Sequence, residues 1–284
     1  MKKDPIIISG LGGSGTRVIV TILNEIKFDF GYDVNKAFDD LSFTLLFKLP
    51  KNFRSKFKKR SKYVKRRIKI HYKLLNNIKL NFNDYLIILK SGLLHLFHFR
   101  RYDYKWIYKR LKNIIYNRRK SLVLWGWKEP HAITFIEDLY FEYPKSKFIL
   151  LIRNGLDMVY TKNDQQFHNY ANYFGLDKRD TSEVNKFEFW YRFNKYAIGT
   201  GQNLFKDNFH ITYYEDLAEN NRDSISEIIN FTTSKYNDDN IDSIIKKINN
   251  PGSIGRYKEN NMDWIDDKVL AKLKEIGYNI LLNE

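Results

Sequence analysis

Short apolar runs alternate with longer segments of helical periodicity along this chain. The runs are rich in Ile, Leu, Phe and Tyr and end in polar or glycine-containing turns, which is typical of buried strands. They are expected as strands at Pro5–Ser9, Leu122–Trp125, Lys147–Ile152 and Phe209–Tyr214. Because helical patterns separate them, the sequence predicts an α/β fold, a parallel sheet with helices on both faces.

The helical segments carry apolar residues at the spacing of one buried face. The first helix is expected to begin at a cap formed by Ser14 or Thr16. Its buried face would consist of Val18, Ile19, Ile22, Leu23 and Ile26. A long helix is expected over Glu183–Phe205, with an aromatic stripe that is more typical of core than of cofactor contact: Phe187, Trp190, Tyr191 and Phe193. Further helices are expected to about Phe47, through Tyr143, from about Leu156, and around the Pro/Gly break in NNPGSIGRYKENN.

The formal charge of +16 is concentrated in one stretch of the chain. Residues 48–120 hold 24 Lys or Arg against two acids, Asp84 and Asp103. The regular apolar positions in KNFRSKFKKRSKYVKRRIKIHYK predict helices with one very basic face, so we expect residues 44–120 to be a basic helical insertion within a single domain, 1–284. The alternatives for this face are an anionic polymer, anionic lipid headgroups, or plain solvent. Nucleic acid is disfavoured, because no recognised binding module is present.

Composition also restricts chemistry and location. Without Cys there is no disulfide, no thiolate nucleophile and no Cys-ligated zinc site. The start of the chain lacks the apolar stretch of a signal peptide, and the longest apolar run, Tyr85–Phe99, is too short to cross a bilayer. We therefore expect a cytoplasmic protein, which the basic segment would bring to the inner membrane surface. His95 and His98, on the apolar run, are expected to be partly buried core histidines.

The stretch GLGGSGTR follows the first strand and fits two phosphate-binding patterns. Gly10, Gly12 and Gly15 spell the dinucleotide fingerprint, and the first and last of them give the frame of a Walker loop. Neither pattern is complete, because Thr16 and Arg17 stand where the Walker loop has Lys, and the segment after the helix is a poor βαβ continuation. Glycines between a strand and a helix still favour an anion site over a plain tight turn.

The carboxyl ends of the strands point to the same kind of ligand. In open α/β sheets, ligands gather outside these ends. Here they read GLGGSGTR, WGWKEPH, RNGLDMVYTKN and YEDL. Most of these segments carry cations or hydroxyls, which predicts a pocket for a multiply anionic ligand.

This set of motifs resembles the sulfotransferases that use 3′-phosphoadenosine 5′-phosphosulfate, whose fold is P-loop NTPase-like. Their first loop holds the 5′-phosphosulfate with a Ser-Gly-Thr tripeptide, which Ser14, Gly15 and Thr16 match. Their second signature is an Arg at a strand end with a Ser eight residues later, both on the 3′-phosphate. Here Arg153 ends KFILLI, and Thr161 supplies the hydroxyl two turns along the expected helix.

Three further motifs extend the resemblance to about residue 258. The turn WGWKEP is similar to the W-x-W-K-E-P turn of bacterial members, and Lys128 precedes Arg153 at about the family spacing. In YEDL, Tyr214 matches the family's Tyr near the adenine. PGSIGRYKEN is similar to the late loop that closes over the nucleotide, and its residues are Gly252, Ser253, Gly255, Arg256, Tyr257 and Lys258.

The resemblance implies in-line transfer of a sulfuryl group to a hydroxyl, with adenosine 3′,5′-bisphosphate as product and no metal. Backbone N–H groups from Gly12 to Thr16 would hold the 5′ end, and Lys128 and Arg17 would stabilise the transferring group. The family's basic residue before Ser-Gly-Thr is Gly13 here, so Arg17 and Lys128 are its available substitutes.

The sequence does not decide which residue is the general base. Some family members take it from the segment after the first helix, which favours Asp39 or Asp40. Others take it from beside the Lys of the second turn, which favours Glu129 or His131. The aspartates are equally compatible with solvated helix acids, and the histidine with packing under the turn.

Three functions remain compatible with the sequence. The first is a sulfotransferase whose hydroxyl acceptor is a carbohydrate or glycolipid. The second is a P-loop kinase of a small molecule or a nucleotide-binding module, which would bind ATP with Mg²⁺. The third is a nucleotide-, polyanion- or membrane-binding protein that is catalytically impaired by Gly13.

Overall fold

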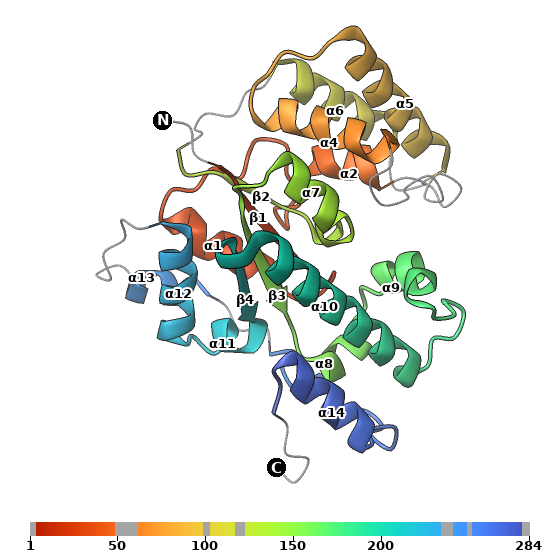
Figure 1. Ribbon diagram of the computed structural model, residues 1–284, viewed down its shortest axis with the longest axis vertical. Coiled ribbons are helices and arrows are strands. Elements are labelled where there is room, and N and C mark those ends of the chain that lie inside the picture. Colours follow the sequence, from red (N-terminus) through yellow and green to blue (C-terminus); the bar gives the residue numbers. More distant parts are fainter. Residues whose placement is uncertain are drawn as a thin grey trace.

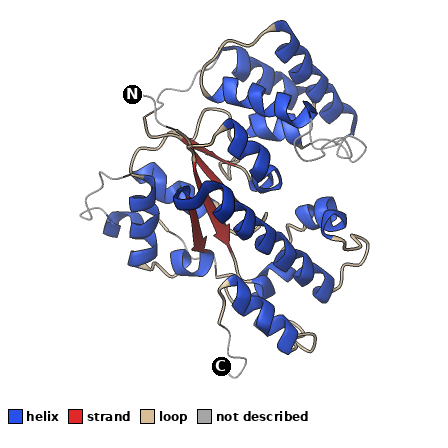
Figure 2. Ribbon diagram, viewed as in Figure 1, coloured by secondary structure: helices blue, strands red, loops and turns tan. Residues whose placement is uncertain are grey.

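One parallel sheet lies at the centre of the chain (Figures 1 and 2). The computed structural model describes residues 4–48, 62–98, 103–116, 123–233, 241–248 and 252–279. The sheet has the order β2-β1-β3-β4, and its strands are β1 (Ile6–Gly10), β2 (Gly126–Lys128), β3 (Lys147–Ile152) and β4 (Phe209–Tyr213). All neighbouring strands are parallel, so their carboxyl ends share one edge.

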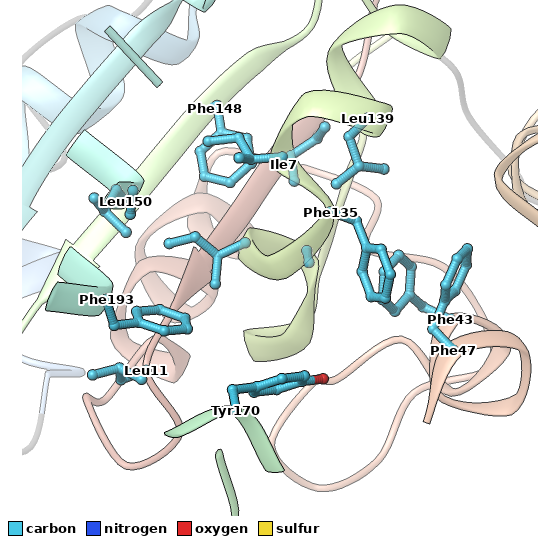
Figure 3. Packing of buried hydrophobic residues seen from close by; sticks show 14 of the residues in the cluster. Ile7, Leu11, Phe43, Phe47, Phe135, Leu139, Phe148, Leu150, Tyr170 and Phe193 are labelled. Atoms are coloured by element: carbon cyan, nitrogen blue, oxygen red, sulfur yellow. The ribbon is translucent and has the colours of Figure 1, made fainter. Parts of the chain in front are cut away.

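Helices cover both faces of the sheet, as the sequence predicts. Alternate residues of β1 separate into two cores: Ile7 joins one with α10 (Glu183–Phe205), and Ile8 joins the other with α1 (Arg17–Glu25). Figure 3 shows the first core, where Ile7, Phe148 and Leu150 of the sheet meet aromatic side chains of the helices. Outside the group beside β2, the other described helices are α7 (Ile136–Glu142), α8 (Gly155–Val159), α9 (Gln165–Tyr170), α11 (Tyr214–Ala218), α12 (Arg222–Thr232), α13 (Ile241–Ile245) and α14 (Asp267–Ile276). Short 3-10 turns are η1 (Pro130–Phe135), η2 (Ala171–Phe174), η3 (Lys206–Asn208) and η5 (Arg256–Glu259).

A helical group stands beside the edge of the sheet that β2 forms (Figure 1). It consists of α2 (Leu41–Phe47), α4 (Lys62–Leu75), α5 (Phe82–His98) and α6 (Tyr104–Tyr116), and α2 contacts the other three. The exposed face of α4 is basic and carries Lys62, Lys65, Arg66 and Lys69. Residues 49–61, 99–102 and 117–120 of the basic stretch lie outside the described residues, and so does the Asn249–Pro251 part of the Pro/Gly break. No helix that the structure describes is long and apolar enough to cross a bilayer.

The second strand lies later in the chain than the sequence predicts. It was expected over Leu122–Trp125, but β2 begins at Gly126 and ends at Lys128. Leu122 is outside the described residues, and Trp125 lies just before the strand, where it forms an isolated bridge with Asp29 and its carbonyl accepts from the N–H of Ile6 at 3.0 Å. Lys128 was expected in the turn because it is polar, but its backbone pairs with Ile8 in the sheet. The strand can include this lysine because its ammonium group donates a hydrogen bond to the Ala37 carbonyl.

The position of Thr161 and the burial of His98 also differ from the expectations. The helix after β3 ends at Val159, so Thr161 does not stand two turns along it but follows its end. His95 is buried and bonds the Leu45 carbonyl of α2 at 3.1 Å, as expected of a core histidine. His98 is exposed instead, because it is the last residue of α5.

Candidate active site

The loop after β1 is held in a conformation that requires glycine. Gly13 and Gly15 have φ angles of +97° and +93°. A Cβ on Gly15 would lie 2.3 Å from the ring of Tyr214, so the loop packs directly on the residue that follows β4. The expected helix cap is not formed: Thr16 occupies the cap position of α1 without a side-chain bond, and Ser14 Oγ is buried without a hydrogen-bond partner among the described residues.

Several backbone N–H groups of this loop remain available to a ligand. Gly12 donates its N–H to Gln166 Oε1, and Ser14 donates to the Leu11 carbonyl at 2.9 Å. Within the part of the chain that the structure describes, the N–H groups of Gly13, Gly15 and Thr16 donate no hydrogen bond. They stand at the start of α1, where the helix dipole favours an anion.

Gln166 was not among the residues singled out from the sequence. Its side chain accepts from Gly12 and donates through Nε2 to the Pro130 carbonyl at 2.9 Å. It therefore ties the first loop to the turn after β2. Nothing in the spacing of QQFHNY distinguishes it, because the contact depends on where α9 docks.

Lys128 and Asp39 form a pair at the end of β2. The Lys128 side chain is 3% exposed, and its Nζ donates to the Ala37 carbonyl at 2.8 Å and to Asp39 Oδ1. Asn35 Nδ2 donates to the other carboxylate oxygen of Asp39 at 2.8 Å. Lys128 is thus an oriented, paired cation rather than a free one, and two residues singled out separately from the sequence are in contact.

Glu129 is buried beside this pair. Its oxygens accept from Thr44 Oγ1 at 3.1 Å and from the backbone N–H of His131 at 3.2 Å. Burial, together with the neighbouring Asp39 carboxylate, raises the pKa of Glu129 to about 8. His131 Nδ1 lies 2.9 Å from the Tyr170 hydroxyl, which fixes the ring under the turn.

Asp40 is not a solvated acid but a structural one. It is buried and caps α2 by accepting from the N–H groups of Ser42 and Phe43 at 2.8 and 3.0 Å. Burial by itself would raise the pKa of Asp40, but His71 at 3.2 Å and the bonds to the cap outweigh it and hold the pKa below its ordinary value. Its carboxylate is fully used by the fold, which removes it as a candidate base.

Arg153 meets the late loop at the end of β3. Its guanidinium is buried and donates to Asp157 Oδ2 at 3.2 Å, to Ser253 Oγ at 3.1 Å and to the Ser253 carbonyl. The Arg153 Cζ lies 4.6 Å from the centroid of the Tyr214 ring, and its Nε has no hydrogen-bond partner among the described residues. Three segments that the sequence analysis singled out separately therefore converge on one guanidinium.

Asp157 holds that arrangement together and was missed in the sequence. Besides Arg153, it accepts from the N–H groups of Gly255 at 3.1 Å and Tyr257 at 3.4 Å. The signal was present as an acid four residues after Arg153, and the two side chains form an ion pair at 3.2 Å across the start of α8.

The rest of the late loop is a tight turn that brings positive charge near Arg153. Gly252 and Gly255 both have positive φ, at +63° and +78°. Arg256 Nε donates to the Ser253 carbonyl at 3.2 Å, and burial together with the charge of Arg153 lowers the Arg256 pKa. Lys258 is exposed at the surface.

Two cavities meet at this edge of the sheet. One, of about 490 Å³, is lined by the first loop, Arg17, Lys128, Arg153 and Tyr214. The other, of about 670 Å³, is lined by Glu129, His131 and residues of the helical group. Asp39, Gly12, Pro130 and Asn163 line both, so the cavities adjoin beside the Lys128–Asp39 pair. Such an arrangement suits an anionic donor on one side and an acceptor on the other.

Thr161 lies outside the cavity that contains Arg153. Thr161 faces Gly13 and lines a small cavity with Leu11 and Met158, instead of the cavity that contains Arg153. Among the described residues, no group of three or more His, Asp and Glu is placed to hold a metal ion.

Comparisons with known proteins identify the family of this chain. The chain matches the model of the sulfotransferase family over residues 5–238. A search of curated proteins found no match. The sulfotransferase domain from the curacin biosynthetic pathway superimposes with a TM-score of 0.51 at 14% identity, covering 99% of each chain, which shows a common fold. A sulfotransferase domain from the Synechococcus PCC 7002 olefin synthase gives a TM-score of 0.47 at 14% identity, covering 98% of this chain and 97% of that one. Because the family match spans most of the sequence, the chain belongs to the sulfotransferase family and is an enzyme of sulfuryl transfer.

Proposed function

We propose that the donor is 3′-phosphoadenosine 5′-phosphosulfate and that the acceptor is a hydroxyl of a carbohydrate or glycolipid. The observation that carries the proposal is the pair of adjoining cavities with Lys128 and Asp39 at their junction. An anion-binding loop lies on one side of this junction and a buried acid, Glu129, on the other.

The residues of the first cavity fit a nucleotide with phosphates at two positions. The free N–H groups of Gly13, Gly15 and Thr16 suit the 5′ end, where Ser14 Oγ is a further buried donor. Arg153 retains an unpartnered Nε beside the Tyr214 ring, which suits a 3′-phosphate with the adenine nearby. Ser253 and Arg256 stand around the same guanidinium.

The donor would supply the sulfuryl group, which leaves its phosphate oxygen as a new bond forms from sulfur to the acceptor oxygen. Lys128, oriented by Ala37 and Asp39, would neutralise the charge that develops on the leaving oxygen, and Arg17 at the cavity wall would add to it. We assign the base to Glu129, which lines the acceptor cavity and whose pKa of about 8 lies close to neutral pH. Asp39 would then position Lys128.

Thermal shift with nucleotides tests the donor. Adenosine 3′,5′-bisphosphate at about 100 times its dissociation constant should add about 2.7 kcal/mol to stability. AMP should stabilise much less, because it lacks the 3′-phosphate. Greater stabilisation by ATP with Mg²⁺ would favour a kinase instead, and equal stabilisation by AMP would contradict the assignment of Arg153.

We also propose that α5 contacts an anionic membrane surface. The exposed side of this helix is apolar, with Phe82 and Phe97 each 76% exposed and Leu89 and Leu93 between them. Its buried side holds Asp84, Ser91 and His95 beside Ile88, so polar groups are buried while larger apolar side chains are exposed. Exposed Lys79 and Lys90 flank the apolar stripe and suit lipid phosphates.

Vesicle sedimentation tests the membrane contact. The protein should sediment with vesicles of phosphatidylglycerol and phosphatidylcholine and less with phosphatidylcholine alone. Leu89→Gln with Leu93→Gln should reduce this binding, whereas Val184→Gln, an exposed apolar residue on α10, should not. Equal sedimentation of all three proteins would contradict the proposal.

A further inference from the structure

The cavity of about 670 Å³ beside Glu129 is rich in cations from the helical group. Lys36 lines it from the segment before α2, Lys48 from the end of α2, and Lys105 and Lys109 from successive turns of α6. The two lysines of α6 come close to the two from the α2 region only in the folded chain.

The acids near this cavity do not pair with three of those lysines. Asp39 is paired with Lys128, and Asp33 is paired with Arg110 at 2.9 Å. Glu129 is largely protonated at neutral pH, because its pKa is raised to about 8. Among the residues that the structure describes, Lys36, Lys105 and Lys109 form no ion pair with an acid. A concave site with uncompensated positive charge attracts anions.

The other lining groups suit a sugar. Asn163 and Gln165 offer amides that bond hydroxyls, and Trp106 offers a half-buried aromatic ring against which Arg110 stacks at 5.0 Å. The cavity volume lies within the range of small-molecule sites. A few oriented polar groups on such a wall select the orientation of the ligand.

This inference rests on the proposed function and refines its acceptor. We propose that the acceptor is an acidic saccharide, with the reacting hydroxyl beside Glu129 and Asp39 and a carboxylate, sulfate or phosphate of the same molecule held by Lys105 and Lys109. The positive wall of α6 then selects charged acceptors over neutral ones and sets the register of the sugar in the cavity.

Matched sugars test the charge requirement, with adenosine 3′,5′-bisphosphate present at saturation. The probes are maltose, its uronic acid form, its 6-phosphate and its 6-sulfate, and binding is measured by calorimetry. At least one charged probe should bind about tenfold or more tightly than maltose, the effect of a charge-assisted hydrogen bond. The three anionic probes distinguish which group the site holds.

Two double variants locate the effect. Lys105→Ala with Lys109→Ala should abolish the preference for the charged probe, whereas Lys65→Ala with Lys69→Ala, an equally spaced exposed pair on α4, should retain it. Equal binding of maltose, loss of preference in both double variants, or binding of an oligonucleotide in place of every sugar would overturn the inference.

Nucleotide binding separates the two levels of the proposal. If the bisphosphate stabilises the enzyme and the sugars bind without charge preference, the donor site stands and the acidic acceptor fails. If the bisphosphate does not bind, the proposed function fails, and the acceptor assignment fails with it.

Discussion

Thr161 lies directly against Gly13. A Cβ built on Gly13 would stand 2.7 Å from Thr161 Oγ1, and the φ angle of +97° at this position already disfavours any side chain. A basic residue at this position of the loop, which the sulfotransferase resemblance leads one to expect, would displace Thr161 and strain the backbone. The cation has to come from elsewhere, and Lys128 and Arg17, which both line the cavity beside this loop, are the residues we propose in its place.

Gly13→Ala should therefore destabilise the protein by about 1–3 kcal/mol, the cost of a side chain at strongly positive φ together with a steric clash. Chemical denaturation measures it. In a Thr161→Ala background the steric part should be relieved while the backbone part remains, so the two changes should be non-additive. A Gly13→Ala protein as stable as the original would show that the loop adopts another conformation.

Arg153→Ala should weaken the binding of adenosine 3′,5′-bisphosphate by about 1.5–3 kcal/mol, which is the usual effect of removing a charge-assisted hydrogen bond. AMP should bind almost as before, because Arg153 is proposed to contact only the 3′-phosphate. Arg192→Ala, on the exposed side of α10, provides a control that removes the same charge. An equal loss of AMP and bisphosphate binding would place Arg153 elsewhere in the site.

Lys128→Met should lower kcat by orders of magnitude and change bisphosphate affinity only modestly, because the charge it neutralises develops in the transition state. Methionine keeps the length of the buried stem but removes the ammonium that Asp39 and Ala37 orient. Arg17→Ala should show the same pattern with a smaller effect, since Arg17 is exposed. Single-turnover transfer to an acceptor separates the chemical step from binding, and full turnover by Lys128→Met would refute the assignment.

The order of the elements was readable from the sequence because each strand is a short apolar run and each helix has a clear periodicity. The long helix over Glu183–Phe205 was predicted to the residue. The start of β2 was misplaced, because Lys128 is a buried polar residue whose partners, Ala37 and Asp39, come from a distant segment. Local pattern does not reveal such tertiary compensation.

The candidate site shows the same division. Residues at strand ends could be singled out from the sequence because a parallel sheet brings those ends to one edge. Asp157 and Gln166 were not found, because their functions depend on how α8, α9 and the late loop dock. Lys105 and Lys109 of α6 could not be assigned to the larger cavity from the sequence, because their position depends on how α6 packs in the folded chain.

Glu129 should make stability fall as pH rises from weakly acidic to weakly basic values. Burial and the Asp39 carboxylate raise its pKa from 4.5 to about 8 in the folded protein, so between these values the folded state keeps a proton that the unfolded state has lost. Stability should decrease by about 1.4 kcal/mol per pH unit within that window and level off above it. Glu129→Gln should remove this contribution, which denaturation at pH 5, 7 and 9 would measure.

The same titration separates Glu129 from Asp39 as the base. If Glu129 accepts the acceptor's proton, transfer should increase with pH as the carboxyl ionises and reach a plateau above about 8, because only the ionised form can act as the base. Glu129→Gln should lose both the rate and the pH dependence but keep bisphosphate affinity, whereas Asp39→Asn should retain the rise and lose rate through a misplaced Lys128. Transfer by Glu129→Gln at the original rate, with the pH dependence intact, would assign the base to Asp39 or His131 instead.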